Sequence, residues 1–224
     1  DDLFHPRESL GSATAAGAPV ALADVTLGVP VVPGKFIGLW NNYKAAAEKG
    51  GFSHPSHPLY FFKADTSVSG PGAAVTIPEA AGRVVFEGEL GIVIGQTCKA
   101  ASPEAAAEAI FGYTCINDIT SLGMLDADPS FPQWTRDKSF DTFGVIGPCI
   151  TELDNPDSLS VRTLVNGEER QNYPVSDMFF SPLDLVSLIS GDMTLNPGDV
   201  IACGTSLGVK TMKPDTTVSV EIDG

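Results

Sequence analysis

Apolar side chains alternate with polar or small ones in several short segments of the chain, and this period of two is typical of β-strands. The clearest case runs from Arg83 to Gly95. Glu87 and Glu89 fall on one face of this segment, together with Val85, Gly91 and Val93, and the large apolar residues at positions 84, 86, 90, 92 and 94 fall on the other. Because both faces carry apolar groups, we expect protein to cover both sides of this strand.

Similar, shorter patterns predict strands over residues 31–40, 59–63, 113–117, 161–165, 168–173, 200–203 and 216–222. Asn166-Gly167 separates two of these segments, and this dipeptide favours a two-residue hairpin turn of type I′.

Three short helices are predicted from their end signals. Residues 42–50 form the first, which Gly50-Gly51 ends. Ser102-Pro103-Glu104 supplies an N-cap, a proline at the first position and an acid in the first turn of a helix that runs to Gly112. Ser181 to Asp184 has the Ser-x-x-Asp form of a third helix start. Residues 54–58, 64–82 and 131–143 have the composition of loops.

Eight or nine short strands against three short helices favour a mainly β fold of the α+β class with antiparallel pairing, because few helices are placed to make crossover connections. Residues 1–30 are rich in Ala, Gly and Pro without a clear period, so we expect an N-terminal arm or extension. Residues 31–224 are expected to form a single domain. The 43% apolar content is sufficient for its core.

The net charge of −15, with only 13 Lys and Arg residues, argues against two classes of partner. Nucleic acids and anionic membranes both need basic patches, so we expect neither. No apolar run reaches the roughly 18 residues of a membrane span, and the start Asp1-Asp2 is unlike a secretory leader. A soluble, cytoplasmic protein is expected. The four cysteines lack paired spacing, so we expect free, mostly buried thiols and no zinc site.

The two glutamates of the strongest strand are the first candidates for chemistry. Glu87 and Glu89 lie roughly 7 Å apart along a strand, and two like charges in a partly dry place need a cation or a strong basic partner. Asp118 directly follows the strand at 113–117 and is the leading candidate to join them. Three carboxylates make an all-oxygen site that suits Mg²⁺, Mn²⁺ or Ca²⁺. Alternatively, both glutamates form surface ion pairs on an edge strand.

The loop at 131–143 is the second candidate region. It places Gln133, Arg136 and Lys138 among aromatic residues in a chain that is poor in cations. Such donors can hold the carboxylate or enolate oxygen of a small anionic substrate. The alternative is that the Arg and the Lys are solvated surface residues.

A third motif, Gly204-Thr205-Ser206-Leu207-Gly208, has the Gly-x-Ser-x-Gly form of a nucleophile elbow. A serine hydrolase also needs a histidine further along the chain, and none follows His57. We therefore expect the turn to offer backbone N–H groups or the Thr205 hydroxyl to a bound anion. His54 and His57 are expected to be exposed, and Cys203 to be a small buried thiol.

From Phe36 to its end, the chain resembles the fumarylacetoacetate hydrolase family. Six ordered sequence blocks carry the resemblance: Gly38-Leu39-Trp40-Asn41-Asn42-Tyr43, Phe61-Phe62-Lys63, Phe86-Glu87-Gly88-Glu89-Leu90, residues 112–118, residues 133–142 and residues 193–205. The resemblance implies a mixed β-roll or distorted barrel with a few short helices, usually paired as a homodimer. Larger members carry an extra N-terminal domain, for which this chain has no room.

The resemblance also implies roles for individual residues. Glu87, Glu89 and Asp118 match the ligands of a divalent ion, usually magnesium. Lys138 matches a lysine that stabilises or protonates an enolate. Lys63, Gln133 and Thr205 match positions that line the pocket. The implied substrate is a small anionic 2-oxo or dicarbonyl acid.

Many members carry a histidine on the short helix after Asn-Tyr, and the corresponding stretch here is Lys44-Ala45-Ala46-Ala47-Glu48. Three hypotheses therefore stay open. The first is a metal-dependent hydrolase that cleaves a C–C bond in an acylpyruvate or related 2,4-dioxo acid, with Glu48 or a loop histidine as base. The second is an isomerase, tautomerase or decarboxylase of a 2-oxo or 2-hydroxydienoate acid. The third is a metal-binding member without this catalysis. The resemblance implies that relatives continue past Gly224, so whether the C-terminus is truncated stays open.

Overall fold

The computed structural model describes residues 17–223 of the chain. A sheet of seven strands runs through the body in the order β2-β1-β11-β5-β6-β8-β3. Its strands are β1 (Phe36–Trp40), β2 (Leu59–Lys63), β3 (Val68–Ser69), β5 (Gly88–Ile94), β6 (Ile110–Asp118), β8 (Gly144–Ile146) and β11 (Val200–Ala202). Most neighbouring strands are antiparallel, and β1–β11 and β3–β8 are the parallel pairs. The mainly β, α+β class predicted from the sequence is confirmed.

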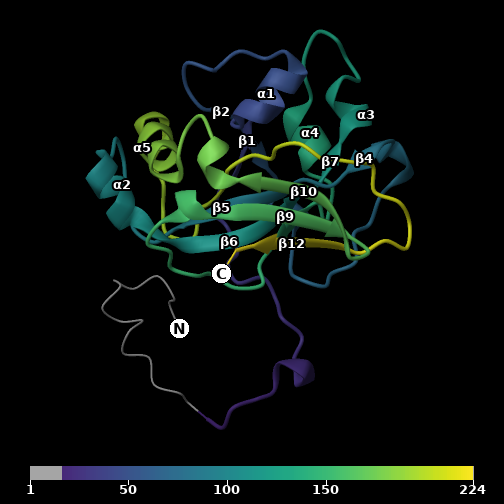
Figure 1. The fold of residues 1–224 in the computed structure, drawn as a ribbon, viewed down its shortest axis with the longest axis horizontal. Helices are drawn as coiled ribbons and strands as arrows, with labels where there is room; N and C mark the ends of the chain where they lie inside the picture. The colour runs from purple at the N-terminus through teal and green to yellow at the C-terminus, as the bar shows by residue number, and fades with distance from the viewer. Residues whose placement is uncertain (1–16, 224) are drawn as a thin grey trace.

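Two smaller sheets complete the β structure. The first has the order β10-β9-β12, with β9 (Ser160–Val165), β10 (Glu168–Pro174) and β12 (Val218–Ile222). It lies across the large sheet, and Figure 1 shows its strands in front of β5 and β6. The second pairs β4 (Val84–Val85) with β7 (Thr120–Ser121).

Five α-helices lie around the sheets: α1 (Lys44–Gly50), α2 (Pro103–Ala109), α3 (Leu122–Leu125), α4 (Trp134–Lys138) and α5 (Pro182–Asp192). Short 3₁₀ turns lie at Leu22–Asp24, Asp65–Ser67, Glu79–Ala81, Pro156–Ser158 and Val175–Asp177. Figure 1 shows α1, α3 and α4 at one end of the body and α2 beside α5 at one side. No helix in residues 17–223 is long and apolar enough to cross a bilayer.

The core divides along the two faces of β5, as the alternation of its residues predicts. Leu90, Ile92 and Ile94 pack with residues of β9, β10 and α5, whereas Val93 packs on the opposite side with Ile116 of β6 and neighbouring strands. All seven residues of β5 are buried. The expectation that protein covers both faces of this strand is therefore confirmed.

The local signals at turns and helix starts are also confirmed. Asn166 and Gly167 have φ values of 50° and 80°, and they join β9 to β10 as a hairpin. Ser181 and Asp184 form a reciprocal capping box at the start of α5. The Ser102 side chain caps α2, which ends at Ala109, earlier than expected, because β6 already begins at Ile110.

Other segments also differ from the sequence predictions. The strand predicted at 83–95 is broken into β4 and β5, because Glu87 turns its backbone toward the end of β6, and its N–H donates to Asn117 Oδ1 at 3.1 Å. The segment 131–143 was predicted as a loop but contains α4, whose inward residues Asp137 and Lys138 follow Trp134 at helical spacing. The first strand begins at Phe36 and not at Val31, after a stretch that contains Pro33.

The cysteines in the structure are free, as expected, and their burial varies. Cys203 is buried, Cys98 and Cys115 are half-buried, and Cys149 is exposed, so the expectation of mostly buried thiols is wrong, and that of a buried Cys203 is confirmed. Of the predicted arm at 1–30, residues 1–16 lie outside the described part of the chain. Residues 17–27 run away from the sheets in Figure 1.

Candidate metal and substrate site

Three acidic side chains meet where β5 begins and β6 ends. Glu89 lies on β5, Glu87 lies in the break just before it, and Asp118 is the last residue of β6. The backbone N–H of Asp118 donates to the carbonyl of Glu87 at 2.8 Å, which fixes the two residues side by side. One oxygen from each of the three carboxylates lies within 4.8 Å of the others. The structure thus brings together the three predicted ligands.

Two buried lysines reach the same cluster from other elements. Lys63 of β2 donates to Asp118 Oδ1 at 2.5 Å. Lys138 of α4 donates to Asp118 Oδ2 at 2.6 Å and to Glu87 Oε2 at 2.8 Å. Burial alone would raise the pKa of Asp118, but the charges of Lys138 and Lys63 outweigh it and lower that pKa. Burial would lower the pKa of Lys138, yet Asp118, Glu87 and Glu89 together raise it. Burial lowers the pKa of Lys63, although Asp118 acts in the opposite direction. Both lysines form ion pairs with the acids.

Glu89 is the acid that these lysines leave without an ion pair. Its Oε2 accepts from the backbone N–H of Gly204 at 2.7 Å, and its buried Oε1 has no hydrogen-bond partner among the described residues. Burial, and then the charge of Asp118, raise its pKa well above the usual value. Three carboxylates and two ammonium groups leave one formal negative charge, so the donor set fits a divalent cation bound by Glu87, Glu89 and Asp118.

A glycine and a hydrogen-bonded network hold the Glu87-Gly88-Glu89 segment in place. A Cβ added to Gly88 would lie 2.0 Å from Thr163 Oγ1, so only glycine fits between the two glutamates. Gln171 Oε1 accepts from the N–H of Gly88 at 3.0 Å, and Gln171 Nε2 donates to Thr205 Oγ1 at 2.9 Å. Thr205 in turn donates to the Gly88 carbonyl at 3.0 Å. The backbone N–H of Gly204 thus binds a carboxylate of the protein itself, that of Glu89.

Asp137 is a buried acid near the cluster that sequence reasoning missed. It lies on α4 next to Lys138, its side chain is buried, and neither of its carboxylate oxygens has a partner among the described residues. Burial raises its pKa to about 7, although the charge of Lys138 acts in the opposite direction. The helical spacing of Trp134, Asp137 and Lys138 was the available signal, but the segment was interpreted as a loop.

An open pocket of about 1120 Å³ lies at β2 and α4, the two elements that carry Lys63 and Lys138. Aromatic side chains line it: Trp40, Phe52, Tyr60, Phe61 and Trp134. The Phe61 ring stacks on Trp134 with centroids 5.5 Å apart, and Lys138 Nζ lies 4.9 Å from the centroid of the same Phe61 ring. Phe61 therefore joins the wall of the pocket to the lysine of the cluster.

No contact described for residues 17–223 joins the remaining predicted site residues to the acids. Gln133 is half-buried, and its side chain donates to the carbonyl of Phe131 at 3.3 Å. Arg136 is exposed on α4 and does not line the aromatic pocket. Glu48 is exposed on α1, and none of the contacts described for residues 17–223 joins it to the cluster. The roles predicted for these residues stay predictions.

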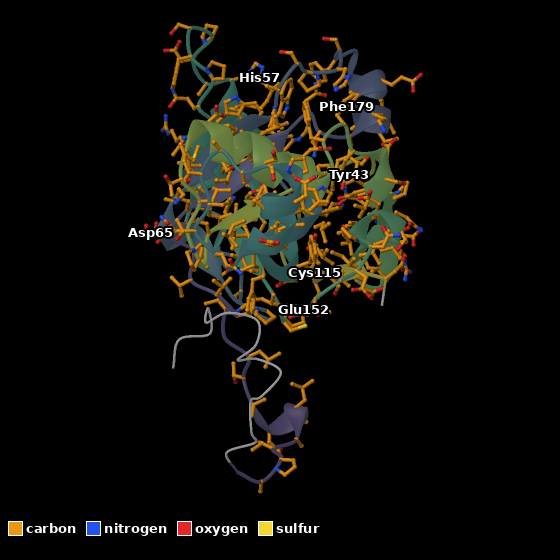
Figure 2. All side chains as sticks on the ribbon, turned by 90° about the vertical axis from the view of Figure 1, so that its left-hand side faces the viewer. Tyr43, His57, Asp65, Cys115, Glu152 and Phe179 are labelled. Carbon is orange, nitrogen blue, oxygen red and sulfur yellow. The ribbon has the colours of Figure 1, made fainter. Side chains whose placement is uncertain are left out.

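The two histidines of the Pro-rich loop are exposed, as expected. His54 stacks on Phe179 with centroids 4.4 Å apart. His57 lines the aromatic pocket. In Figure 2 it lies at the end of the body away from residues 17–27, whereas Cys115 lies near the opposite end.

The mixed β-sheets and the cluster of three carboxylates, a donor set that suits a divalent cation, together indicate an enzyme. Comparison with known proteins names the family. The model for the fumarylacetoacetate (FAA) hydrolase C-terminal domain matches residues 35–224, so the chain belongs to the fumarylacetoacetate hydrolase family. It is an enzyme of that family, in which the similar solved structures include hydrolases and isomerases.

Individual relatives span most of the chain. An uncharacterized protein of Archaeoglobus fulgidus is 42% identical over 207 residues, which are 92% of this chain and 82% of that protein. The structure of 2-hydroxyhepta-2,4-diene-1,7-dioate isomerase from Mycobacterium marinum is 38% identical with a TM-score of 0.85, covering 94% of this chain and 79% of its own. Maleylpyruvate hydrolase from Sphingobium sp. SYK-6, in complex with manganese(II) and pyruvate, is 30% identical with a TM-score of 0.82, covering 97% of this chain and 77% of its own.

Proposed function

We propose that the protein is a divalent-metal-dependent hydrolase that cleaves a C–C bond in an acylpyruvate or a related 2,4-dioxo acid through an enolate. The observation that carries this proposal is the unpartnered, buried Oε1 of Glu89 inside an acidic triad that lies beside Lys138. When bound, a divalent ion supplies positive charge next to the two oxygens of a 2-oxo acid and so favours the enolate. The all-oxygen donor set supports Mg²⁺ as the resident ion, with Mn²⁺ as a substitute.

Each residue of the cluster has a distinct part in this proposal. Glu87, Glu89 and Asp118 hold the ion, and Lys63 neutralises Asp118 from the buried side. Lys138 uses two of its three N–H donors on Glu87 and Asp118, which leaves one for the oxygen of the substrate on which negative charge develops. Lys138→Gln should therefore lower the turnover rate by about 10²- to 10³-fold, the usual effect of removing one such donor.

Isomerisation or decarboxylation of a 2-oxo or 2-hydroxydienoate acid is the second candidate. Hydrolysis needs a base to direct water at a carbonyl, whereas these reactions need only the enolate. Ala46 occupies the position near which many relatives carry a histidine, and Glu48 is exposed. This observation favours the second candidate, and the maleylpyruvate hydrolase among the similar structures favours the first.

Two assays separate these possibilities. The first measures exchange of the C3 protons of 2-oxobutanoate for deuterium by NMR with Mg²⁺ or Mn²⁺, which reports enolate formation alone. The second measures release of pyruvate from acetylpyruvate, which requires cleavage of the C–C bond. Exchange together with pyruvate release supports the hydrolase. Exchange without pyruvate release supports the second candidate, and a protein that catalyses neither with either metal contradicts both.

A further inference from the structure

The chemistry of the open pocket beside the acidic cluster restricts the substrate further. Apolar and aromatic side chains form most of its wall, and the ring of Trp134 contacts those of both Trp40 and Phe61. The centroids of Trp40 and Phe52 are 4.9 Å apart, which extends the aromatic surface toward α1. Such a wall binds hydrocarbon or a ring through burial of apolar area.

The charged groups of the pocket are of the wrong sign for a second carboxylate. Asp126 and Asp192 lie among its lining residues, and Asp192 Oδ2 accepts from the Tyr60 hydroxyl at 3.2 Å. No lysine or arginine is among the lining residues, and His57 is the only basic side chain there. A carboxylate in this pocket would lose water and meet two acids, both of which cost free energy.

Phe61 connects the pocket with the proposed metal site, because it lines the pocket and contacts Lys138. Phe61 and Lys63 lie on one face of β2, roughly 7 Å apart along the strand, and Lys63 binds Asp118. Lys138 contacts the cluster through its ammonium group and lies over the ring of Phe61. A molecule whose oxygens bind at the proposed metal site can therefore extend past Phe61 into the aromatic pocket.

We propose, on the basis of the function proposed above, that the substrate carries a single carboxylate at the metal end and an uncharged apolar or aromatic tail between Trp40, Phe61 and Trp134. This substrate class differs from the dioate in the name of the Mycobacterium marinum isomerase, which has a carboxylate at each end.

A matched pair of ligands tests the proposal without catalysis. 2-Oxooctanoate and 2-oxosuberate have the same head and the same number of carbons, and they differ in a terminal methyl against a terminal carboxylate. Pyruvate serves as the ligand that has a head and no tail. Binding to the full chain with Mn²⁺ is measured by calorimetry. It is also followed by fluorescence, because Trp40 and Trp134 are the two tryptophans of the sequence and both line the pocket.

We expect 2-oxooctanoate to bind at least about tenfold more tightly than 2-oxosuberate and to change the tryptophan emission. Trp134→Ala should remove most of this preference, while pyruvate binding stays unchanged and reports an intact metal site. Phe131→Ala is the control, since this neighbouring aromatic residue is 67% exposed and does not line the pocket. The double variant Asp126→Asn with Asp192→Asn should strengthen binding of 2-oxosuberate.

Equal binding of the two eight-carbon acids, with pyruvate also bound, would overturn the inference and leave the proposed function standing. Tighter binding of 2-oxosuberate would do the same. If no 2-oxo acid binds in the presence of Mn²⁺ or Mg²⁺, the proposed function fails, and the inference fails with it.

Discussion

Glu89 and Gly204 are joined by a hydrogen bond of 2.7 Å from the glycine backbone to one carboxylate oxygen, and the other oxygen, also buried, has no partner in residues 17–223. The turn that begins at Gly204 therefore orients Glu89 without neutralising it. Gly204 has a φ of 90°, a backbone conformation that residues other than glycine rarely adopt. An added Cβ would lie 3.3 Å from the carbonyl oxygen of Leu39. The protein thus holds a buried carboxylate in a fixed direction, and a cation bound there would stabilise its negative charge.

The first prediction concerns that charge. A divalent ion that binds the folded chain should raise its unfolding temperature, because an ion at about 100 times its dissociation constant adds about 2.7 kcal/mol to the stability. Glu89→Gln should abolish the rise between EDTA and Mg²⁺ or Mn²⁺ in a thermal unfolding assay. Glu104→Gln, on the exposed side of α2, should keep it. A full rise in the Glu89 variant would show that the ion binds elsewhere.

The second prediction concerns the buried pair of Lys63 and Asp118, whose side chains are both 0% exposed. Lys63→Met leaves Asp118 with Lys138 as its remaining cation, and removing one member of a buried pair typically costs about 3–5 kcal/mol. We expect a loss of this order in urea unfolding. Lys99→Met should change the stability by less than about 0.5 kcal/mol, because Lys99 is exposed. Equal effects of the two substitutions would contradict the structural role of Lys63.

The parts of the fold that could be predicted from the sequence are those governed by neighbours in the chain. The Asn166-Gly167 hairpin and the capping box of Ser181 and Asp184 depend on a few adjacent residues, and both are present. The break at Glu87 depends on a hydrogen bond to Asn117, 30 residues away, so alternation alone could not indicate it.

The same distinction applies to the candidate site. Glu87, Glu89 and Asp118 were predicted from strand faces and strand ends, and the structure brings them together. The contact of Lys63 with Asp118 spans 55 residues, and family resemblance suggested only that Lys63 lines a pocket. Asp137 was missed because its burial comes from the packing of α4 against β2 and β7, which a loop interpretation does not provide.

The third prediction concerns the glycine between the two glutamates. Gly88→Ala would place a methyl group 2.0 Å from Thr163 Oγ1, and such overpacking typically costs about 1–3 kcal/mol. The strain should also displace Glu87 and Glu89, so the thermal shift with Mg²⁺ should shrink. Adding Thr163→Ala removes the nearest atom and should restore part of both losses. Gly191→Ala is the control, since no atom lies within 4 Å of its added Cβ.

The last prediction concerns Asp137 and the pH dependence of stability. Its pKa of about 7 in the folded chain lies above the ordinary value of 3.8. Between these values the folded state keeps a proton that the unfolded state has released, so the contribution of Asp137 to stability is complete below the lower pKa and declines as pH rises. The decline is at most about 1.4 kcal/mol per pH unit and ends above the folded pKa. The Asp137→Asn variant has no titratable group at this position, so its stability should lack this decline.

Urea unfolding of the parent and the variant in EDTA, at several pH values between 4 and 8, measures the difference in stability between them. The stability of the Asn variant relative to the parent should increase with pH up to about 7 and then level off. A constant difference would mean that Asp137 is ionised in the folded protein throughout this range.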